Sequence, residues 1–243
     1  MAGRYDLIGL DYSELRKPDP RIAAAVESAL GDSRTILNVG AGAGSYELAD
    51  RQVTALEPSG AMIRQRPPSA APCVQGRAEE LPFADRSFDA SMAILTVHHW
   101  SGKAEGLAEM RRVTRGPIVI LTYDPAFRGF WLFDYLPGLV ALDEAQMPPL
   151  SAYSAALGPV SITPVPIPHD CTDGFLSAYW RRPAAYLDPK VRAAMSSFWA
   201  LGDVSQALGR LEADLESGAW ARRHCGLTRL EAIDCGYRLV VTR

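Results

Sequence analysis

Three glycines at alternate positions, Gly40, Gly42 and Gly44, directly follow a short apolar run at residues 36–39. Glycine tolerates left-handed backbone angles and has no side chain, so this spacing lets the backbone turn tightly and approach a ligand closely. If a helix follows, the N–H groups at its start favour an anionic group or a lone-pair acceptor. The glycines therefore predict a ligand-binding turn.

A carboxylate supplies a second part of this predicted site. Glu57 ends the next apolar run, at residues 53–57. Neighbouring parallel strands end at the same edge of a sheet, and a carboxylate there can accept hydrogen bonds from both hydroxyls of a ribose. The turn and the carboxylate together predict a ligand that contains a nucleoside.

Two common nucleotide-binding motifs do not fit the glycine run. The dinucleotide motif G-x-G-x-x-G needs glycine where Ser45 stands, which disfavours a nicotinamide oxidoreductase, and the Gly-Lys-Ser or Gly-Lys-Thr of a P-loop is absent. The order GAGAG instead resembles the first motif of the class I S-adenosylmethionine-dependent methyltransferases. The stretches TALEPSGAMIRQR and GRAEELPFADRSFDASMAILTVHHW resemble later motifs of their UbiE-like (methyltransferase type 11) branch.

This resemblance implies that the chain binds S-adenosylmethionine and releases S-adenosylhomocysteine. It also implies the binding residues: Gly40, Ala41 and Gly42 against the cofactor, Glu57 at the ribose, Pro58 and Met62 beside the adenine, Ala78 and Glu79 at the adenine edge, and Leu95 and Thr96 near the methionine moiety. Tyr5, Tyr12 and Arg16 resemble a segment that closes over the methionine carboxylate, for which arginine is a suitable bidentate partner.

Two positions depart from the family pattern. Asn38 stands where an acidic residue commonly precedes the glycines, and Arg77 stands where an acidic residue often holds the adenine amino group. These two departures support the hypothesis that the protein is a degenerate binding or regulatory module that has lost catalytic turnover.

If the group to be methylated is a hydroxyl, the protein must also supply a base that takes its proton. Histidine is suited to this role because its pKa of about 6.5 lies near neutrality. His169, after an expected strand, is the first candidate and His98 the second. As structural alternatives, His169 is an interfacial residue beside a capping Asp170, and one histidine of the pair His98-His99 is buried and hydrogen-bonded while the other faces the substrate cleft. Adjacent residues on a strand point to opposite faces, so we predict no metal site at the histidine pair.

The elements that position these residues alternate along the chain. Apolar runs at 35–39, 53–57, 73–75, 88–95 and 118–123 alternate with helical patterns near 20–30, 46–50, 59–66 and 103–114. Strict alternation predicts an α/β fold with a parallel sheet. The proline-containing run at 162–167 predicts an edge strand, 237–242 a closing strand, and 172–220 helices.

With the resemblance, these elements predict a single domain over residues 1–243. Its fold is a Rossmann-like seven-stranded methyltransferase sheet, mostly parallel with the last strand antiparallel. The core comprises about 20–124, 160–168 and 236–243, and a helical lid comprises about 125–158 and 170–225.

Composition excludes several classes of protein. The net charge is −3 and lysine occurs only at positions 17, 103 and 190, so a nucleic-acid partner is not expected. The charged N-terminus is unlike a secretory signal, and no apolar run approaches the roughly 20 residues of a membrane span. The four dispersed cysteines favour neither zinc nor disulfides. We expect a cytoplasmic protein and leave its oligomeric state open.

The leading hypothesis is methyl transfer from S-adenosylmethionine to a small, hydrophobic or aromatic acceptor, because the aromatic-rich segment 123–220 can line an apolar pocket. Two alternatives stay open. In one, the bound S-adenosylmethionine promotes a cyclisation or rearrangement without methyl transfer. In the other, the protein is the turnover-deficient binding module.

Overall fold

The computed structural model describes residues 15–242, which contain a seven-stranded sheet in the order β3-β2-β1-β4-β5-β9-β6. Strands β1 to β5 are parallel to one another, and β9 is antiparallel to both β5 and β6. The strands are β1 (Thr35–Val39), β2 (Gln52–Glu57), β3 (Cys73–Gln75), β4 (Ala90–Ile94), β5 (Ile118–Tyr123), β6 (Val160–Pro164) and β9 (Tyr237–Thr242). The predicted Rossmann-like sheet, with its last strand antiparallel, is confirmed.

The central strands are buried because helices cover both faces of the sheet. Every residue of β5 is buried. Its side chains alternate between two apolar cores, as strand geometry requires: Val119 and Leu121 belong to one, Ile118 and Ile120 to the other.

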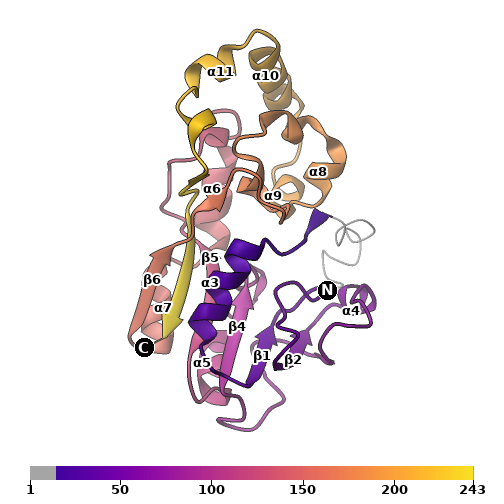
Figure 1. Ribbon diagram of the computed structural model, residues 1–243, viewed down its shortest axis with the longest axis vertical. Helices are drawn as coiled ribbons and strands as arrows, with labels where there is room; N and C mark the ends of the chain where they lie inside the picture. Colours follow the sequence, from indigo (N-terminus) through magenta and orange to yellow (C-terminus); the bar gives the residue numbers. More distant parts are fainter. Residues whose placement is uncertain (1–14, 243) are drawn as a thin grey trace.

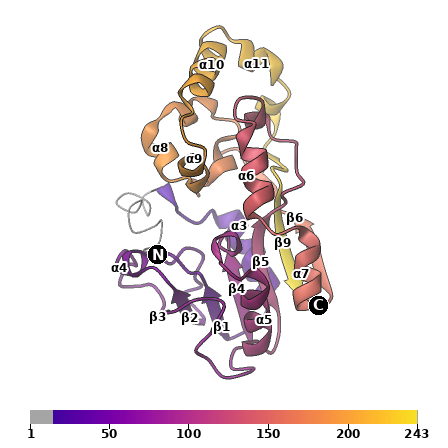
Figure 2. The same ribbon diagram turned by 180° about the vertical axis from the view of Figure 1, so that it is seen from behind.

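Helix α3 (Pro20–Leu30) covers one face, and α5 (Lys103–Val113) and α7 (Leu150–Leu157) cover the other (Figures 1 and 2). The α3 helix begins where Asp19 accepts a hydrogen bond from the Arg21 N–H and Pro20 occupies the first helical position. Ile22, Val26 and Leu30 recur at helical spacing and are buried against the sheet. The short helix α4 (Gly60–Arg64) packs beside β2 and β3.

A mainly helical region, the lid, stands above the carboxyl ends of the parallel strands in Figure 1. Its helices are α6 (Gly138–Gln146), α8 (Pro189–Ala193), α9 (Ser196–Ala200), α10 (Ser205–Glu216) and α11 (Ala219–Arg223). The 3₁₀ turns η2 (Trp131–Asp134), η3 (Leu176–Tyr179), η4 (Pro183–Leu187) and η5 (Leu227–Arg229) connect them, and β7 (Ile167–Pro168) pairs with β8 (Ala232–Ile233) beside them. Trp131, Trp180 and Tyr186 are buried inside the lid, where the Trp131 Nε1 donates to the Trp180 carbonyl.

The first predicted lid segment, 125–158, differs from the observed layers at its end. Helix α7 packs against α5 and β6 on the sheet, and its Tyr153 and Leu157 belong to the core under α5. The Tyr153 hydroxyl lies 2.7 Å from Thr122 Oγ1 on β5. Only the part of that segment before α7 therefore stands above the strand ends.

Two local predictions were wrong. Residues 46–50 form turns, not a helix, because Tyr46 has a left-handed φ of 64° and its hydroxyl donates to Asp173 across the fold. The edge strand is β6, Val160–Pro164, and it ends before Ile167, which pairs instead with Ile233 in the separate ladder. Prolines at 164 and 166 cannot donate ladder hydrogen bonds, which is consistent with the break between the two strands.

Candidate functional site

The glycine turn and Glu57 lie together at the ends of β1 and β2. Gly40, Gly42 and Gly44 all have positive φ angles, of 70°, 53° and 96°. The Gly40 and Ala41 N–H groups donate to the Leu56 carbonyl at 2.8 and 3.0 Å, which fixes the turn on β2. The Glu57 carboxylate accepts hydrogen bonds from Gly42 N and Ser59 N, each at 2.9 Å. Burial raises the pKa of this carboxyl, and the two amide hydrogen bonds oppose that shift.

The glycine turn also touches the end of β4. A Cβ atom added to Gly40 would lie 2.1 Å from Thr96 Oγ1, so no larger residue fits there. Leu95, just before Thr96, has a left-handed φ of 51° and donates its N–H to the Leu121 carbonyl. Such strained non-glycine residues are frequent at functional sites. The sites predicted on β1, β2 and β4 thus meet at one edge of the sheet.

The other predicted cofactor residues surround the same edge. Met62 is buried, and its Cε lies 3.4 Å from where a Cβ on Gly42 would stand. Pro58 is exposed, and its carbonyl accepts from Gln75. Ala78 is buried, and Glu79 accepts a hydrogen bond from Gly102 N at 2.9 Å, which joins this loop to the start of α5.

A buried ion pair between Glu47 and Arg66, which was not predicted from the sequence, contacts the glycine turn. The Arg66 Nη2 lies 2.7 and 2.8 Å from the two Glu47 oxygens, and both side chains are under 8% exposed. Arg66 also donates to the Gly42 carbonyl, and Asn38 donates to Glu47 at 3.2 Å. Glu47 therefore brings a carboxylate next to Asn38, the position where the family pattern commonly has an acid. This role of Glu47 was not predicted, because residues 46–50 were expected to form a helix.

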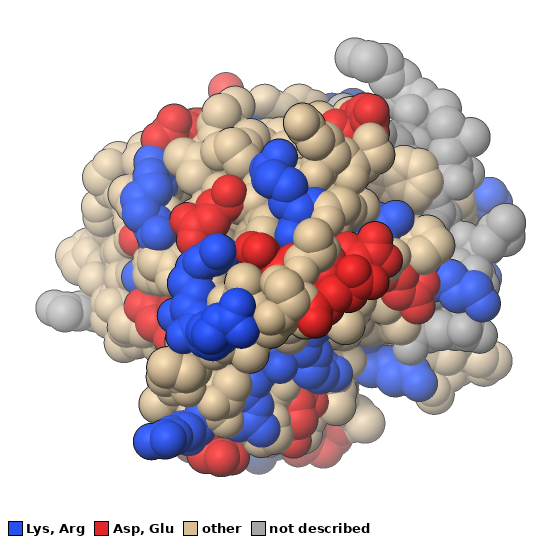
Figure 3. Space-filling model, turned by 90° about the horizontal axis from the view of Figure 1, so that it is seen from above, with Lys and Arg blue, Asp and Glu red and all other residues tan. Residues whose placement is uncertain are grey.

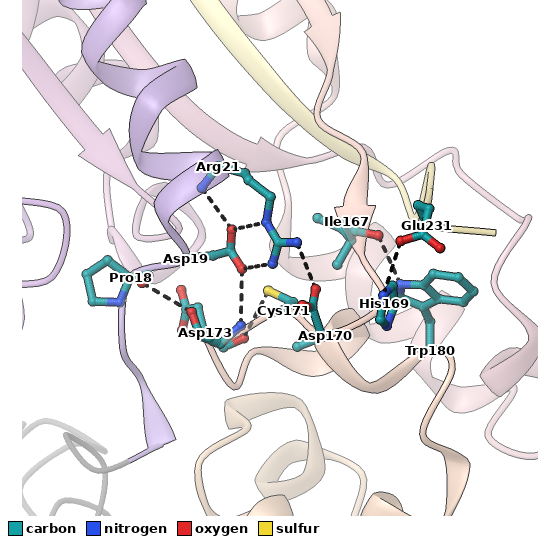
Figure 4. Close-up of polar contacts among 12 residues, drawn as sticks. Pro18, Asp19, Arg21, Ile167, His169, Asp170, Cys171, Asp173, Trp180 and Glu231 are labelled. Carbon is teal, nitrogen blue, oxygen red and sulfur yellow. Dashed lines mark hydrogen bonds and ion pairs between the residues drawn. The ribbon is translucent and has the colours of Figure 1, made fainter. Parts of the chain in front are cut away.

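Arg16 is placed by an ion pair with the lid. Its Nε lies 2.6 Å from Oδ1 of Asp173, which is 1% exposed, and Oδ2 of Asp173 accepts from the Tyr46 hydroxyl at 2.9 Å. Figure 4 shows the adjoining contacts, in which Asp19 faces the Arg21 guanidinium and Arg21 reaches Asp170. Burial alone would raise the pKa of Asp19, but hydrogen bonds from Arg21 and Thr172 lower it to about 2. Tyr5 and Tyr12 lie outside the described residues.

A cavity lies between the ends of β4 and β5 and the lid. Its polar lining comes from Arg16, His98, His99, Asp143, Ser196 and Ser197. Its aromatic and sulfur-containing lining comes from Tyr123, Phe175, Tyr237, Met147 and Met195. Leu95 also lines it, so the cavity adjoins the edge of the sheet where the glycine turn lies.

The histidines occupy two different environments. His98 and His99 belong to the 3₁₀ turn η1 (Val97–His99), their rings lie 3.8 Å apart, and both line the cavity. Burial lowers the pKa of His98 well below its ordinary value, so its imidazole is neutral at pH 7. His169 is not among the cavity-lining residues. Its Nε2 lies 3.3 Å from Glu231 at the β7–β8 ladder, toward which Figure 4 shows it turned.

Two further ionisable groups line the cavity, and the sequence did not point to the first of them, Asp143. Asp143 on α6 is 7% exposed, and burial raises the pKa of its carboxyl to about 7. Tyr123 ends β5 and is 5% exposed, and burial raises the pKa of its hydroxyl. A carboxylate on the apolar face of a helical pattern was the available signal for Asp143, since Leu139 and Met147 flank it at i−4 and i+4.

Within residues 15–242, no helix is both long and apolar enough to cross a membrane. The same residues contain no group of three or more histidine, cysteine, aspartate or glutamate side chains that could hold a metal ion.

Comparison with known proteins places this site in a family. A family model described as a methyltransferase domain matches residues 37–117, from β1 through α5. A protein of Anabaena variabilis, assigned as a methyltransferase from an antibiotic biosynthesis pathway, has a crystal structure that is 37% identical, with a TM-score of 0.86 over 94% of this chain and 99% of that one.

Two other proteins are similar over less sequence or at lower identity. Demethylmenaquinone methyltransferase of Beutenbergia cavernae is 36% identical over 160 residues, which are 57% of this chain and 64% of that protein. The cyclase SpnF has a TM-score of 0.52 over 92% of this chain and 80% of its own, but at 16% identity it shares the fold alone. Because the Anabaena protein is matched over nearly its whole length, this chain belongs to the class I S-adenosylmethionine-dependent methyltransferases, in their UbiE-like branch, a family whose methyl donor is S-adenosylmethionine.

Proposed function

We propose that this protein transfers the methyl group of S-adenosylmethionine to a small, hydrophobic or aromatic acceptor held between the sheet and the lid. The observation that carries the proposal is the cavity. It joins Leu95 and His98, which follow β4, to Tyr123 at the end of β5 and to Phe175 and Met195 of the lid. An acceptor in this cavity would lie beside the strand ends at which the family holds its methyl donor.

The residues of the glycine turn and Glu57 fit the donor. The positive-φ glycines leave no side chain between the turn and a ligand, and Gly40 cannot be larger. The two Glu57 oxygens accept one amide hydrogen bond each. A carboxylate has about four lone-pair sites, so each oxygen keeps capacity to accept a ribose hydroxyl. In this proposal Met62, Ala78 and Glu79 border the adenine.

The lining of the cavity favours an acceptor molecule that is mostly apolar. Aromatic rings and thioethers form much of its lining and would exclude water from the reacting atoms. Demethylmenaquinone, named as the acceptor of the Beutenbergia relative, is a hydrophobic quinone, which supports the same class of acceptor here. Figure 3 shows acidic and basic side chains interspersed over the upper face, without the uniform basic surface that a nucleic-acid substrate would favour.

Methyl transfer requires mainly that the protein position the acceptor atom against the methyl group. The methyl group of a sulfonium is already activated, so holding the acceptor atom in line with it can lower the barrier by roughly 7–11 kcal/mol. The lid and the cavity wall supply that orientation. His98, neutral and partly buried in the wall, is one available hydrogen-bond acceptor for the incoming group.

The test is an acceptor screen that monitors S-adenosylhomocysteine release. The protein is incubated with S-adenosylmethionine and with matched aromatic, aliphatic and highly polar compounds. We expect release with hydrophobic or aromatic acceptors only. Release only with polar acceptors would contradict the proposal. Conversion of a compound to an isomer without release would support the cyclisation alternative, and cofactor binding without any turnover would support the binding module.

A further inference from the structure

Asp143 is a buried carboxylate with no hydrogen-bond donor. Its side chain is 7% exposed, it lines the cavity, and none of the described residues donates a hydrogen bond to its carboxylate. Arg128 is the cation that acts on it, but Arg128 is itself paired with Glu144. Burying a carboxylate without a partner costs free energy, so an unpaired one in a cavity wall points to a ligand.

Tyr123 presents a second unpartnered polar group to the same cavity. Its hydroxyl is buried and has no hydrogen-bond partner among the described residues. The ring is held edge-on against Tyr237, at a centroid distance of 5.3 Å, and against Phe127, at 6.5 Å. The ring is therefore fixed by packing while its hydroxyl is left available to a ligand.

Resting on the proposed function, we infer that the acceptor is an aromatic hydroxyl, that Asp143 accepts its proton and that Tyr123 donates a hydrogen bond to the same oxygen. As the bond from this oxygen to the methyl carbon forms, the carbon–sulfur bond breaks and sulfur keeps its electron pair. The hydroxyl proton moves to the Asp143 carboxylate and later to solvent. The products are an aryl methyl ether, S-adenosylhomocysteine and one proton.

The surroundings of Asp143 favour a hydroxyl on a ring. Tyr237, Phe175 and Met147 line the same cavity and offer stacking and thioether contacts to an aromatic body. A phenol arrives uncharged and loses its proton only as the new bond forms. An alkylamine would arrive as a cation and would have to lose a proton before it could attack, to a carboxylate that is a weaker base.

The pH dependence follows from the charge environment of Asp143. Burial raises its pKa to about 7, and Arg128 opposes that shift. The other titratable or charged groups of the cavity wall and of α6 beside it are Arg16, His98, His99, Tyr123, Tyr237 and Glu144. Because a proton acceptor must be ionised, we expect methylation of a weakly acidic phenol to slow as pH falls through about 7.

The test compares Asp143→Asn with Glu212→Gln, which changes an exposed carboxylate on α10 in the same way. Single-turnover methylation is measured from labelled S-adenosylmethionine with two probes, 2-naphthol and 4-nitrophenol. For 2-naphthol, Asp143→Asn should lower the rate constant at least ~100-fold while changing the half-saturating concentration less than ~10-fold. For 4-nitrophenol, which ionises without a base near neutral pH, the loss should be under ~10-fold. Glu212→Gln should behave as wild type with both.

Each other outcome decides against part of the inference. Equal losses with both phenols, or none with 2-naphthol, would overturn the role of Asp143. If the wild type methylates arylamines or ring carbons but no phenol, the hydroxyl assignment fails while the proposed function stands. If calorimetry shows cofactor binding but no acceptor of any class releases S-adenosylhomocysteine, the proposed function itself fails. Circular dichroism and thermal unfolding verify that each variant is folded.

Discussion

The Gly42 N–H donates a hydrogen bond of 2.9 Å to the Glu57 carboxylate, so the turn after β1 and the end of β2 form one unit. Gly42 has a positive φ of 53° and Glu57 is 7% exposed. The carboxylate therefore cannot swing into solvent without breaking contacts to the turn. In the proposed complex, the ribose hydroxyls donate to its remaining lone pairs.

Close packing of Gly40 on Thr96 predicts a large cost for Gly40→Ala. The substitution forces a left-handed alanine, which costs about 1–2 kcal/mol, and places Cβ against Thr96 Oγ1, which adds roughly 1–3 kcal/mol. Gly202→Ala is the matched control, since Gly202 has a φ of 71°, close to the 70° of Gly40, but nothing within 4 Å of its Cβ position. Chemical denaturation should show only the first cost for Gly202→Ala. Equal losses for the two variants would argue against a tight contact between the β1 and β4 ends.

The contact of Asp173 with Arg16 and Tyr46 predicts that Asp173 holds the lid on the sheet. Asp173→Ala removes a carboxylate that is 1% exposed and serves both partners, so unfolding free energy should fall by about 3 kcal/mol. Asp170→Ala removes an ion pair with Arg21 in which both side chains are about half exposed, and it should be close to wild type. Similar urea midpoints for the two variants would contradict this assignment.

The raised pKa of Asp143 predicts that its ionisation destabilises the fold. The ordinary pKa is 3.8 and the folded one about 7, so the folded state binds this proton more tightly. The stabilisation of the folded state by the protonated Asp143 carboxyl is therefore fully present below about pH 4 and is lost as pH rises toward 7. Asp143→Asn should raise the unfolding free energy at pH 8 by roughly 2–4 kcal/mol, with little difference at pH 4. A variant that is less stable than wild type at pH 8 would refute the unpaired carboxylate.

Periodicity and spacing predicted much of the sheet, because its strands are short apolar runs bounded by turns. The run at 118–123 is β5 without change, since a strand buried on both faces needs an unbroken apolar sequence. The glycine turn was predictable because left-handed angles demand glycine. The predicted helix at 46–50 failed because a long-range contact, Tyr46 to Asp173, decides the backbone there.

The residues that line the cavity could not be predicted from local sequence patterns in the same way. Asp143 and Tyr123 are twenty residues apart in sequence, on α6 and β5, and meet only through the packing of the lid. The motif resemblance indicated Leu95 and Thr96 but not the residues opposite them. The ion pair of Glu47 with Arg66 was missed for a related reason: its partners come from two loops whose path no local pattern determines.

Isothermal titration calorimetry with S-adenosylhomocysteine tests most directly whether Glu57 and the glycine turn hold the nucleoside. The proteins compared are wild type, Glu57→Gln, and the exposed control Glu80→Gln. We predict that wild type and Glu80→Gln bind alike, while Glu57→Gln binds at least ~10-fold more weakly, a loss of about 1.4 kcal/mol or more. Undiminished affinity in a folded Glu57→Gln protein would contradict this account of the site.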